Sequence, residues 1–261
     1  RNTKLKPDAV NFTKSAEVME NADYILVCVK SGDTQEAALL IAQYGNSLLQ
    51  KTNPIVISFQ NGVRNAQVLS ECLPNYTVMK AEDLVGLFDM ADLPVQVYKD
   101  LSSVQWGKLL MNLNNAVNAL SGKPLLEQLH DNEYRKVMAV VLKEALVAMK
   151  TAGIEPAKTG KVVPKLMPYI MSLPNFLFKK VAAATLKIDP QARSSMYEDL
   201  ALNRKTEVDY LNGEIVALGE AHQVSTPANT AIVKLIKAAE SAREGAPRLT
   251  AATLQQAIAA S

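Results

Sequence analysis

The chain has 261 residues, 48% of them apolar and 21% charged, which is typical of a folded protein of one large or two ordinary domains and excludes intrinsic disorder. Its 28 lysines and arginines against 26 aspartates and glutamates leave a net charge of +2, which gives no sign of binding to nucleic acid or to an anionic membrane. Two cysteines (Cys28, Cys72) and two histidines (His130, His222) are too few for a disulfide framework or a Cys- or His-rich zinc site, so we expect no metal. No apolar run approaches the ~20 residues of a membrane span, and the N-terminus lacks the layout of a signal peptide. We therefore expect a soluble, cytoplasmic protein.

The first hundred residues alternate between strand-like and helix-like segments. Residues 22–29 (ADYILVCV) are apolar and β-branched, as in a strand buried on both faces. A helix capped by Asp33 or Thr34 is expected next, and the pattern then repeats with a strand at 54–59, a helix at 63–72 and a strand around 76–79. This alternation predicts a parallel sheet with helices on its faces.

From residue 102 onward the sequence predicts helices alone. Ser102 or Ser103 is expected to cap the first of them, and Gly153 stands where a glycine ends the second. The predicted helices are 102–121, 131–152, 194–220, one that begins at Thr226-Pro227, and 250–260. We place the domain boundary near residue 102, with an α/β domain in 1–102 and an all-α domain in 103–261.

The helix around residue 110 carries two patterns. Lys108, Asn112 and Asn115 stand at i, i+4 and i+7 and share one face. Asparagine is a poor helix former, so four of them between 112 and 118 require an explanation. The face is either a polar ligand site or an ordinary solvated surface, and the spacing leaves both open. The other pattern is a core stripe of Leu109, Leu113, Ala116, Val117 and Leu120.

Four further positions are candidates for function. Lys30 and Asn61 each follow a predicted strand, and ligands of open α/β sheets bind outside the carboxyl ends of the strands. Ser195 begins the sequence S-x-x-E of a capping box, which makes it a candidate helix cap. Glu207 lies in a mixed-charge segment and is typical of a surface carboxylate. No G-x-G occurs anywhere in the chain, so no glycine loop for a dinucleotide is recognised.

Several segments, in order, resemble the ketopantoate reductase family (2-dehydropantoate 2-reductases). The lysine helix followed by the Thr-Glu-x-Asp-Tyr-x-Asn-Gly segment is the specific combination. The matching segments are ADYILVCVK (22–30), QNG (60–62), WGKLLMN (106–112), RSSM (193–196) and KTEVDYLNGEIVALGEAHQVSTPAN (205–229). The resemblance implies an N-terminal Rossmann-type domain, incomplete in this sequence, and an all-α C-terminal domain.

The same resemblance implies NADPH-dependent reduction of a 2-keto acid, with 2-dehydropantoate, a precursor of pantothenate, as the expected substrate. Lys108 then matches the catalytic lysine and Glu207 the active-site glutamate, while Asn112 and Ser195 match substrate-binding positions. An ammonium can stabilise and protonate the oxygen that becomes negative as hydride adds to the keto carbon.

Lys30 and Asn61 match family residues near the nicotinamide end of NADPH. The residues that discriminate NADPH from NADH follow the second strand of a Rossmann fold, at or before Arg1. Family members also suggest a homodimer formed through the helical domain.

Three departures from the family are visible. Its first strand, glycine loop and second strand would precede Arg1, and we expect this sequence to belong to a longer chain. A further β segment of the family is lacking between about residues 80 and 82. At Ala116 many members have asparagine, so either Asn115 takes over its role in substrate binding or the substrate pocket differs.

Two other functions stay open on this reasoning. One is another 2-hydroxy acid or opine-type dehydrogenase of the same architecture. The other is a truncated, non-catalytic module for binding or dimerisation, which the absence of a glycine loop favours and the joint presence of Lys108, Asn112, Ser195 and Glu207 opposes.

Overall fold

The computed structural model describes residues 13–45, 54–78, 100–158, 163–185 and 189–261. Contacts divide the chain into a sheet unit, Arg1–Gln60 with Arg64–Val97, and a helical unit, Asn61–Val63 with Tyr98–Ser261. The helical unit thus begins a few residues before the boundary predicted near residue 102. In these ranges no helix has the length and apolar character needed to cross a membrane. The predicted fold class, a Rossmann-type domain followed by an all-α domain, is confirmed.

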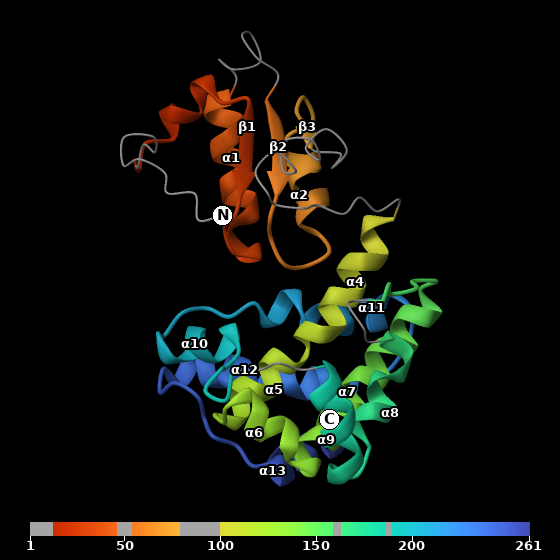
Figure 1. Cartoon of the computed structure of the whole chain (residues 1–261). Coiled ribbons are helices and arrows are strands. Elements are labelled where there is room, and N and C mark those ends of the chain that lie inside the picture. Colours follow the sequence, from red (N-terminus) through yellow and green to blue (C-terminus); the bar gives the residue numbers. More distant parts are fainter. Residues whose placement is uncertain (1–12, 46–53, 79–99, 159–162, 186–188) are drawn as a thin grey trace. The chain divides into compact units, whose positions relative to one another are not determined.

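Among its described residues, the sheet unit contains three parallel strands in the order β1-β2-β3, labelled in Figure 1. They are β1 (Tyr24–Val27), β2 (Ile55–Ser58) and β3 (Thr77–Val78). Tyr24 pairs with Ile55, which pairs in turn with Thr77. Each strand lies within a segment predicted from its β-branched apolar residues, although Met79, the last residue of the third prediction, is outside the described ranges. The predicted parallel sheet is therefore confirmed.

Two helices, α1 (Thr34–Gly45) and α2 (Asn65–Cys72), pack against one face of this sheet. Ile25 and Val27 on that face are buried, whereas Tyr24 is 40% and Leu26 53% exposed. The prediction that β1 is buried on both faces is therefore wrong for the described residues, because α1 and α2 contact only the Ile25 face. The described part of the unit also includes two 3-10 turns, η2 (Ala16–Asn21) and η3 (Ser31–Asp33).

The helical unit is a bundle of helices around α5, α7 and α12 (Figure 1). The apolar stripe predicted across α4 and α5 is buried, because its residues belong to the core of the unit. Its elements are α4 (Leu101–Asn112), α5 (Asn114–Ser121), α6 (Leu125–His130), α7 (Asn132–Thr151), η5 (Pro164–Leu166), α8 (Met167–Met171), α9 (Asn175–Thr185), α10 (Ser195–Ala201), η6 (Val208–Tyr210), α11 (Asn212–Ala221), α12 (Pro227–Ala242) and α13 (Ala251–Ala259).

Gly153 ends α7 as predicted. Its φ of +71° lies in the left-handed region, which glycine adopts without steric cost. The amides of Gly153 and Ile154 then donate to the carbonyls of Lys150 and Met149, which satisfies two oxygens at the end of the helix.

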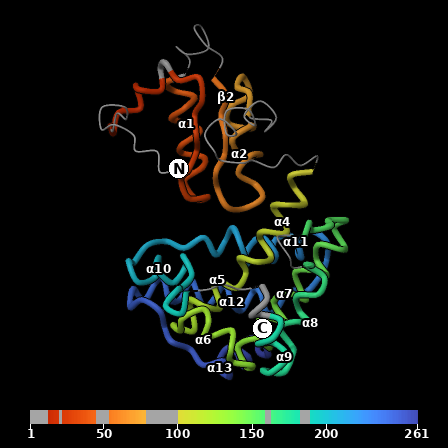
Figure 2. Tube along the Cα trace, viewed as in Figure 1, coloured from red at the N-terminus to blue at the C-terminus, as the bar shows by residue number. Residues whose placement is uncertain are grey.

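Two predicted long helices are broken. The helix expected at 102–121 is interrupted at Leu113, and its cap is Asp100, whose carboxylate accepts from the Ser103 amide at 3.2 Å, rather than Ser102 or Ser103. The helix expected at 194–220 is divided into α10, η6 and α11 because Asn203 adopts a left-handed φ of 52°. Figure 2 follows the chain through this break, between α10 and α11.

A carboxylate from another helix satisfies the start of α12. Thr226 precedes the helix as predicted, but its side chain makes no capping bond. Instead Glu144 on α7 accepts from the amides of Ala228 (2.8 Å) and Asn229 (3.0 Å), and from the Asn229 side chain (3.0 Å). Because α12 is central to the unit, this contact fixes its N-terminus against α7.

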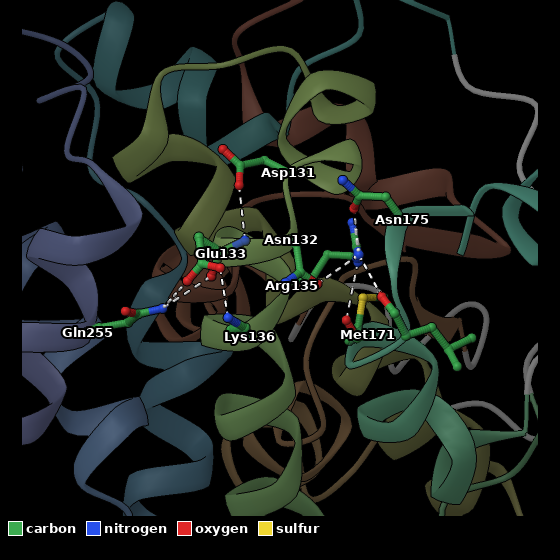
Figure 3. A network of polar contacts seen from close by, with 9 residues as sticks. Asp131, Asn132, Glu133, Arg135, Lys136, Met171, Asn175 and Gln255 are labelled. Carbon is green, nitrogen blue, oxygen red and sulfur yellow. Dashed lines mark hydrogen bonds and ion pairs between the residues drawn. The ribbon is translucent and has the colours of Figure 1, made fainter. Parts of the chain in front are cut away.

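Arg135 on α7 connects α6, α8 and the start of α9 (Figure 3). The residue is 1% exposed, and its guanidinium donates to the carbonyls of Leu129 (2.9 Å), Met171 (3.1 Å) and Leu173 (2.7 Å). It also donates to the side chains of Asn132 (3.0 Å) and Asn175 (2.9 Å) and lies 4.3 Å from the centre of the Phe178 ring. Burial lowers the pKa of this guanidinium below its ordinary value.

We expect Arg135→Leu to lower the free energy of unfolding by about 3 kcal/mol or more. Several buried carbonyls would lose their hydrogen-bond donor, and each buried carbonyl without a donor costs roughly 1–3 kcal/mol. Chemical denaturation would measure the loss. The matched control is Lys136→Ala, which removes an exposed ion pair with Glu133 and should change stability by less than about 1 kcal/mol. Equal losses in the two variants would contradict a supporting role for Arg135.

Candidate active site

Lys30 lies three residues after the end of β1, and Asn61 lies three residues after the end of β2. The two strands are parallel and paired, so they end at the same edge of the sheet. The carbonyl of Lys30 accepts from the Asp33 amide at 2.9 Å and begins η3. Both side chains are partly buried. Their position after the carboxyl ends of strands agrees with the topological expectation, and their role toward a cofactor stays a prediction.

Buried polar side chains connect the segments that follow these two strands. The Asn65 amide donates to Ser31 Oγ at 3.0 Å, and Asn65 Oδ1 lies 3.1 Å from Thr34 Oγ1. Gln60 Nε2 donates to Thr34 Oγ1 at 2.7 Å and to the carbonyl of Val29 at 2.9 Å. Thr34 was expected only as a helix cap, and the roles of Gln60 and Asn65 were not predicted, since hydrogen bonds between residues some 30 positions apart have no local sequence signal.

The second group of candidates lies on α4 and α5. Lys108 is exposed, and Asn112 and Asn115 are partly buried, while Leu109 and Leu113 between them are buried in the core. No side chain of the described residues forms a hydrogen bond or ion pair with the side chain of Lys108, Asn112 or Asn115. The helix is interrupted at Leu113, between Asn112 and Asn115, so the shared face expected from the i, i+4, i+7 spacing stays a prediction. The three side chains offer one ammonium and two amides for contacts with a ligand.

The other two asparagines of this segment are structural. Asn118 is fully buried and donates to the carbonyl of Lys123 (2.9 Å) and to Gln128 Oε1 (3.1 Å). Asn114 exchanges hydrogen bonds with the Gln128 amide, accepting at 2.8 Å and donating at 3.3 Å. Asn114 and Asn118 are thus explained by hydrogen bonds within the helical unit, whereas Asn112 and Asn115 keep their side-chain amides available for a ligand.

Ser194, and not Ser195, is the cap of α10, so the predicted capping box is wrong. The backbone of Ser194 is extended (ψ 155°), and its Oγ accepts from the Tyr197 amide at 3.2 Å. Ser195 is already helical and its side chain is exposed. Ser194 Oγ also donates to the carbonyl of Asn115 at 3.0 Å, which brings Ser195 and Asn115, two predicted substrate contacts, close together.

Glu207 is partly buried and stands immediately before η6, where its carbonyl accepts from the Tyr210 amide at 3.0 Å. Its neighbour Thr206 is buried, and the Thr206 amide donates to Glu240 Oε1 at 2.7 Å. Glu207 is thus held on a fixed segment. The charge pattern alone suggested an exposed surface carboxylate, but the residue is partly buried.

A groove of about 850 Å³ lies elsewhere in the helical unit, between α7 and α8. Its lining is mainly apolar, with Val140, Val147 and Tyr169, and it contains none of the predicted site residues. In the described ranges no three histidine, cysteine, aspartate or glutamate side chains gather as a metal site would require.

Two family models match the chain. Residues 100–240 match the ketopantoate reductase PanE/ApbA C-terminal model, and residues 1–108 match the ketopantoate reductase PanE/ApbA model. The first match alone covers more than half of the chain, and together the two cover both units. These matches confirm the resemblance recognised from the sequence motifs.

Individual relatives agree with the models. A 2-dehydropantoate 2-reductase of Caulobacter vibrioides is 31% identical over 158 residues, which are 60% of this chain and 48% of that relative, so this match spans about half of the relative's length. The 2-dehydropantoate 2-reductase of Pyrobaculum aerophilum is 26% identical over 249 residues, covering 85% of this chain and 78% of its own. The crystal structure of a PanE/ApbA family ketopantoate reductase from Ralstonia eutropha has the same fold, with a TM-score of 0.74, 24% identity and coverage of 90% of this chain and 82% of that one. The chain belongs to the ketopantoate reductase PanE/ApbA family.

Proposed function

We propose that this chain reduces 2-dehydropantoate (ketopantoate) to pantoate with NADPH, and that Lys108 is the general acid. The observation that carries the proposal is the polar face of α4 and α5 in a chain of this family. There Lys108 is exposed, and its ammonium has no ion-pair partner among the described side chains. Two asparagines share the face.

Lys108 suits the chemistry of carbonyl reduction. Hydride addition at the keto carbon develops negative charge on the carbonyl oxygen, and an adjacent ammonium stabilises that charge and delivers the proton. The product is the 2-hydroxy acid. The buried neighbours Leu109 and Leu110 hold this turn of α4 in the core, so the side chain of Lys108 projects from a rigid backbone.

The remaining site residues suit recognition of the substrate. The amides of Asn112 and Asn115 and the hydroxyl of Ser195 are donors for the substrate carboxylate. The carboxylate of Glu207 accepts a hydrogen bond from the terminal hydroxyl of ketopantoate in this proposal.

The proposed cofactor, NADPH, supplies the hydride from its nicotinamide ring when bound. Lys30 and Asn61 provide an ammonium and an amide after the ends of β1 and β2, which fit the carboxamide and ribose oxygens at the nicotinamide end. These two residues fit only the nicotinamide end of NADPH. No described residue belongs to a glycine loop of the G-x-G-x-x-G type, which would hold the pyrophosphate.

We also propose a homodimer and a cytoplasmic location, both by analogy with the family. Neither the helical unit nor the sheet unit has a helix suited to a membrane among its described residues, which agrees with this location.

The rival function is reduction of a different 2-keto acid. Ala116 favours it, since many family members have asparagine at this position. Ala116 is fully buried in the core of the helical unit, so it offers no polar contact to a substrate. Comparison of ketopantoate with keto acids that lack the terminal hydroxyl separates the two functions. The non-catalytic module is not favoured, because the family match extends over both units.

We expect Lys108→Ala to lower kcat for ketopantoate by about 100-fold or more, because general acid catalysis contributes roughly 10²–10⁴-fold. The loss of NADPH absorbance measures the rate. The same variant should change the free energy of unfolding by less than about 0.5 kcal/mol, since the side chain is exposed. Leu109→Ala, one position along, is the control, and should cost roughly 2–5 kcal/mol of stability. Near-normal turnover in Lys108→Ala would refute its role.

We expect Glu207→Gln to narrow the preference for ketopantoate over 2-keto-3-methylbutanoate, which lacks the terminal hydroxyl. A charged acceptor is worth about 1.5–3 kcal/mol in such a hydrogen bond, so the ratio of kcat/KM values should fall by about 10-fold. Steady-state kinetics with both keto acids measures it. An unchanged ratio would show that Glu207 does not recognise the hydroxyl and would favour the rival function.

A further inference from the structure

A chain of buried amides connects α5 to the start of α10. Asn118 Oδ1 accepts from the amide of Ser194 at 2.9 Å, although 76 positions separate the two residues. The other end of the same amide donates to the Lys123 carbonyl and to Gln128 Oε1. The orientation of the Asn118 side-chain amide is fixed by these partners. If the amide were reversed, its NH₂ group would face the N–H of Ser194, and its oxygen would face the two acceptor oxygens of Lys123 and Gln128.

Gln128 is held in turn by Asn114. The two side chains exchange hydrogen bonds, and Gln128 is 1% exposed. The three amides therefore form a closed network on the side of α5 that faces α6 and α10. A fully satisfied buried network of this kind allows one arrangement of the helices that it joins.

Ser194 extends this network to the candidate substrate contacts. Its hydroxyl accepts from the Tyr197 amide, which caps α10, and donates to the carbonyl of Asn115. One side chain thus fixes both the first turn of α10, where Ser195 lies, and the backbone of Asn115. The Arg193 guanidinium adds a hydrogen bond to the Gly122 carbonyl and lies 4.4 Å from the Tyr197 ring centre.

We propose that Ser194 is a positioning residue for keto-acid recognition, acting through Ser195 and Asn115. The inference rests on the proposed function. The Ser194 hydroxyl touches no substrate, because it is 4% exposed and both of its hydrogen bonds are to backbone atoms. Ser194 sets the spacing between the Ser195 hydroxyl and the Asn115 side-chain amide, which would both bind the substrate carboxylate. These contacts would be made in the ground state as well as in the transition state. Loss of the spacing therefore raises KM for the keto acid more than it lowers kcat.

The test measures kcat, KM for ketopantoate, KM for NADPH and Tm in three variants of the full chain. Ser194→Ala removes the cap and the bond to Asn115, and should raise KM for ketopantoate by about 10-fold, as sub-ångström displacements of binding groups do. Ser194→Gly keeps most of the capping stability, because glycine is tolerated at an N-cap, but loses the same bond and should raise this KM equally. Ser194→Thr keeps the hydroxyl and should stay within about twofold of the unmodified chain. KM for NADPH should not change in any of them.

Thr250→Ala is the matched control. Thr250 caps α13 through the Thr253 amide at 3.2 Å and contacts no candidate site residue. Its removal should lower Tm by about 2–4 °C, as Ser194→Ala does, and leave KM for ketopantoate unchanged. If Ser194→Gly binds ketopantoate normally, or if Thr250→Ala raises the same KM, Ser194 is merely structural and the inference is overturned. An unmodified chain that does not reduce ketopantoate overturns the proposed function itself, and this inference with it.

Discussion

The helical unit depends on one constraint, which is that the backbone groups at the ends of its short helices must be hydrogen-bonded inside the core. Side chains from other helices satisfy several of them. Arg135 supplies donors to carbonyls that end α6 and α8, Glu144 accepts the first amides of α12, and Asn118 accepts the amide that precedes α10. The candidate site is connected to this arrangement, since Ser194, from whose amide Asn118 accepts, precedes Ser195 and donates from its hydroxyl to the carbonyl of Asn115.

Features that repeat with a regular period along the chain, such as apolar helix faces, could be predicted from the sequence. Helix breaks and the number of layers that cover a strand have no such period and were missed. The apolar stripe of α4 with α5 was predicted residue by residue, because burial of one helix face repeats about every 3.6 positions. The breaks at Leu113 and Asn203 were missed, because both segments keep helical periodicity through them. The burial of β1 was overestimated, since an apolar run does not tell whether one or two layers cover it.

Within the candidate site, topology and resemblance contributed different residues. Lys30 and Asn61 could be selected because ligand sites follow the carboxyl ends of parallel strands. Lys108 and Glu207 could not be distinguished from ordinary surface charges until the family motif was considered. Ser194 was expected at the start of the helix but was not chosen as its cap, because the cap is decided by which of the two adjacent serines has an extended ψ angle. Asn118 was one of the four asparagines that required an explanation, but its role in holding Ser194 could not be predicted, since the two residues are 76 positions apart.

The break after α10 separates two parts of the candidate site that the sequence placed on one helix. Ser195 begins α10, while Glu207 stands on a separate segment held by the Thr206 contact to Glu240 on α12. The exposed residues 201–205 are the link between them. Length changes in that link are compatible with both anchors, because Ser194 holds the turn that bears Ser195 and Thr206 holds the segment of Glu207. In the proposed site, the contacts to the acid end of a substrate and those to its variable tail would therefore lie on separately anchored segments, so that the tail contact can change while the carboxylate contacts are retained.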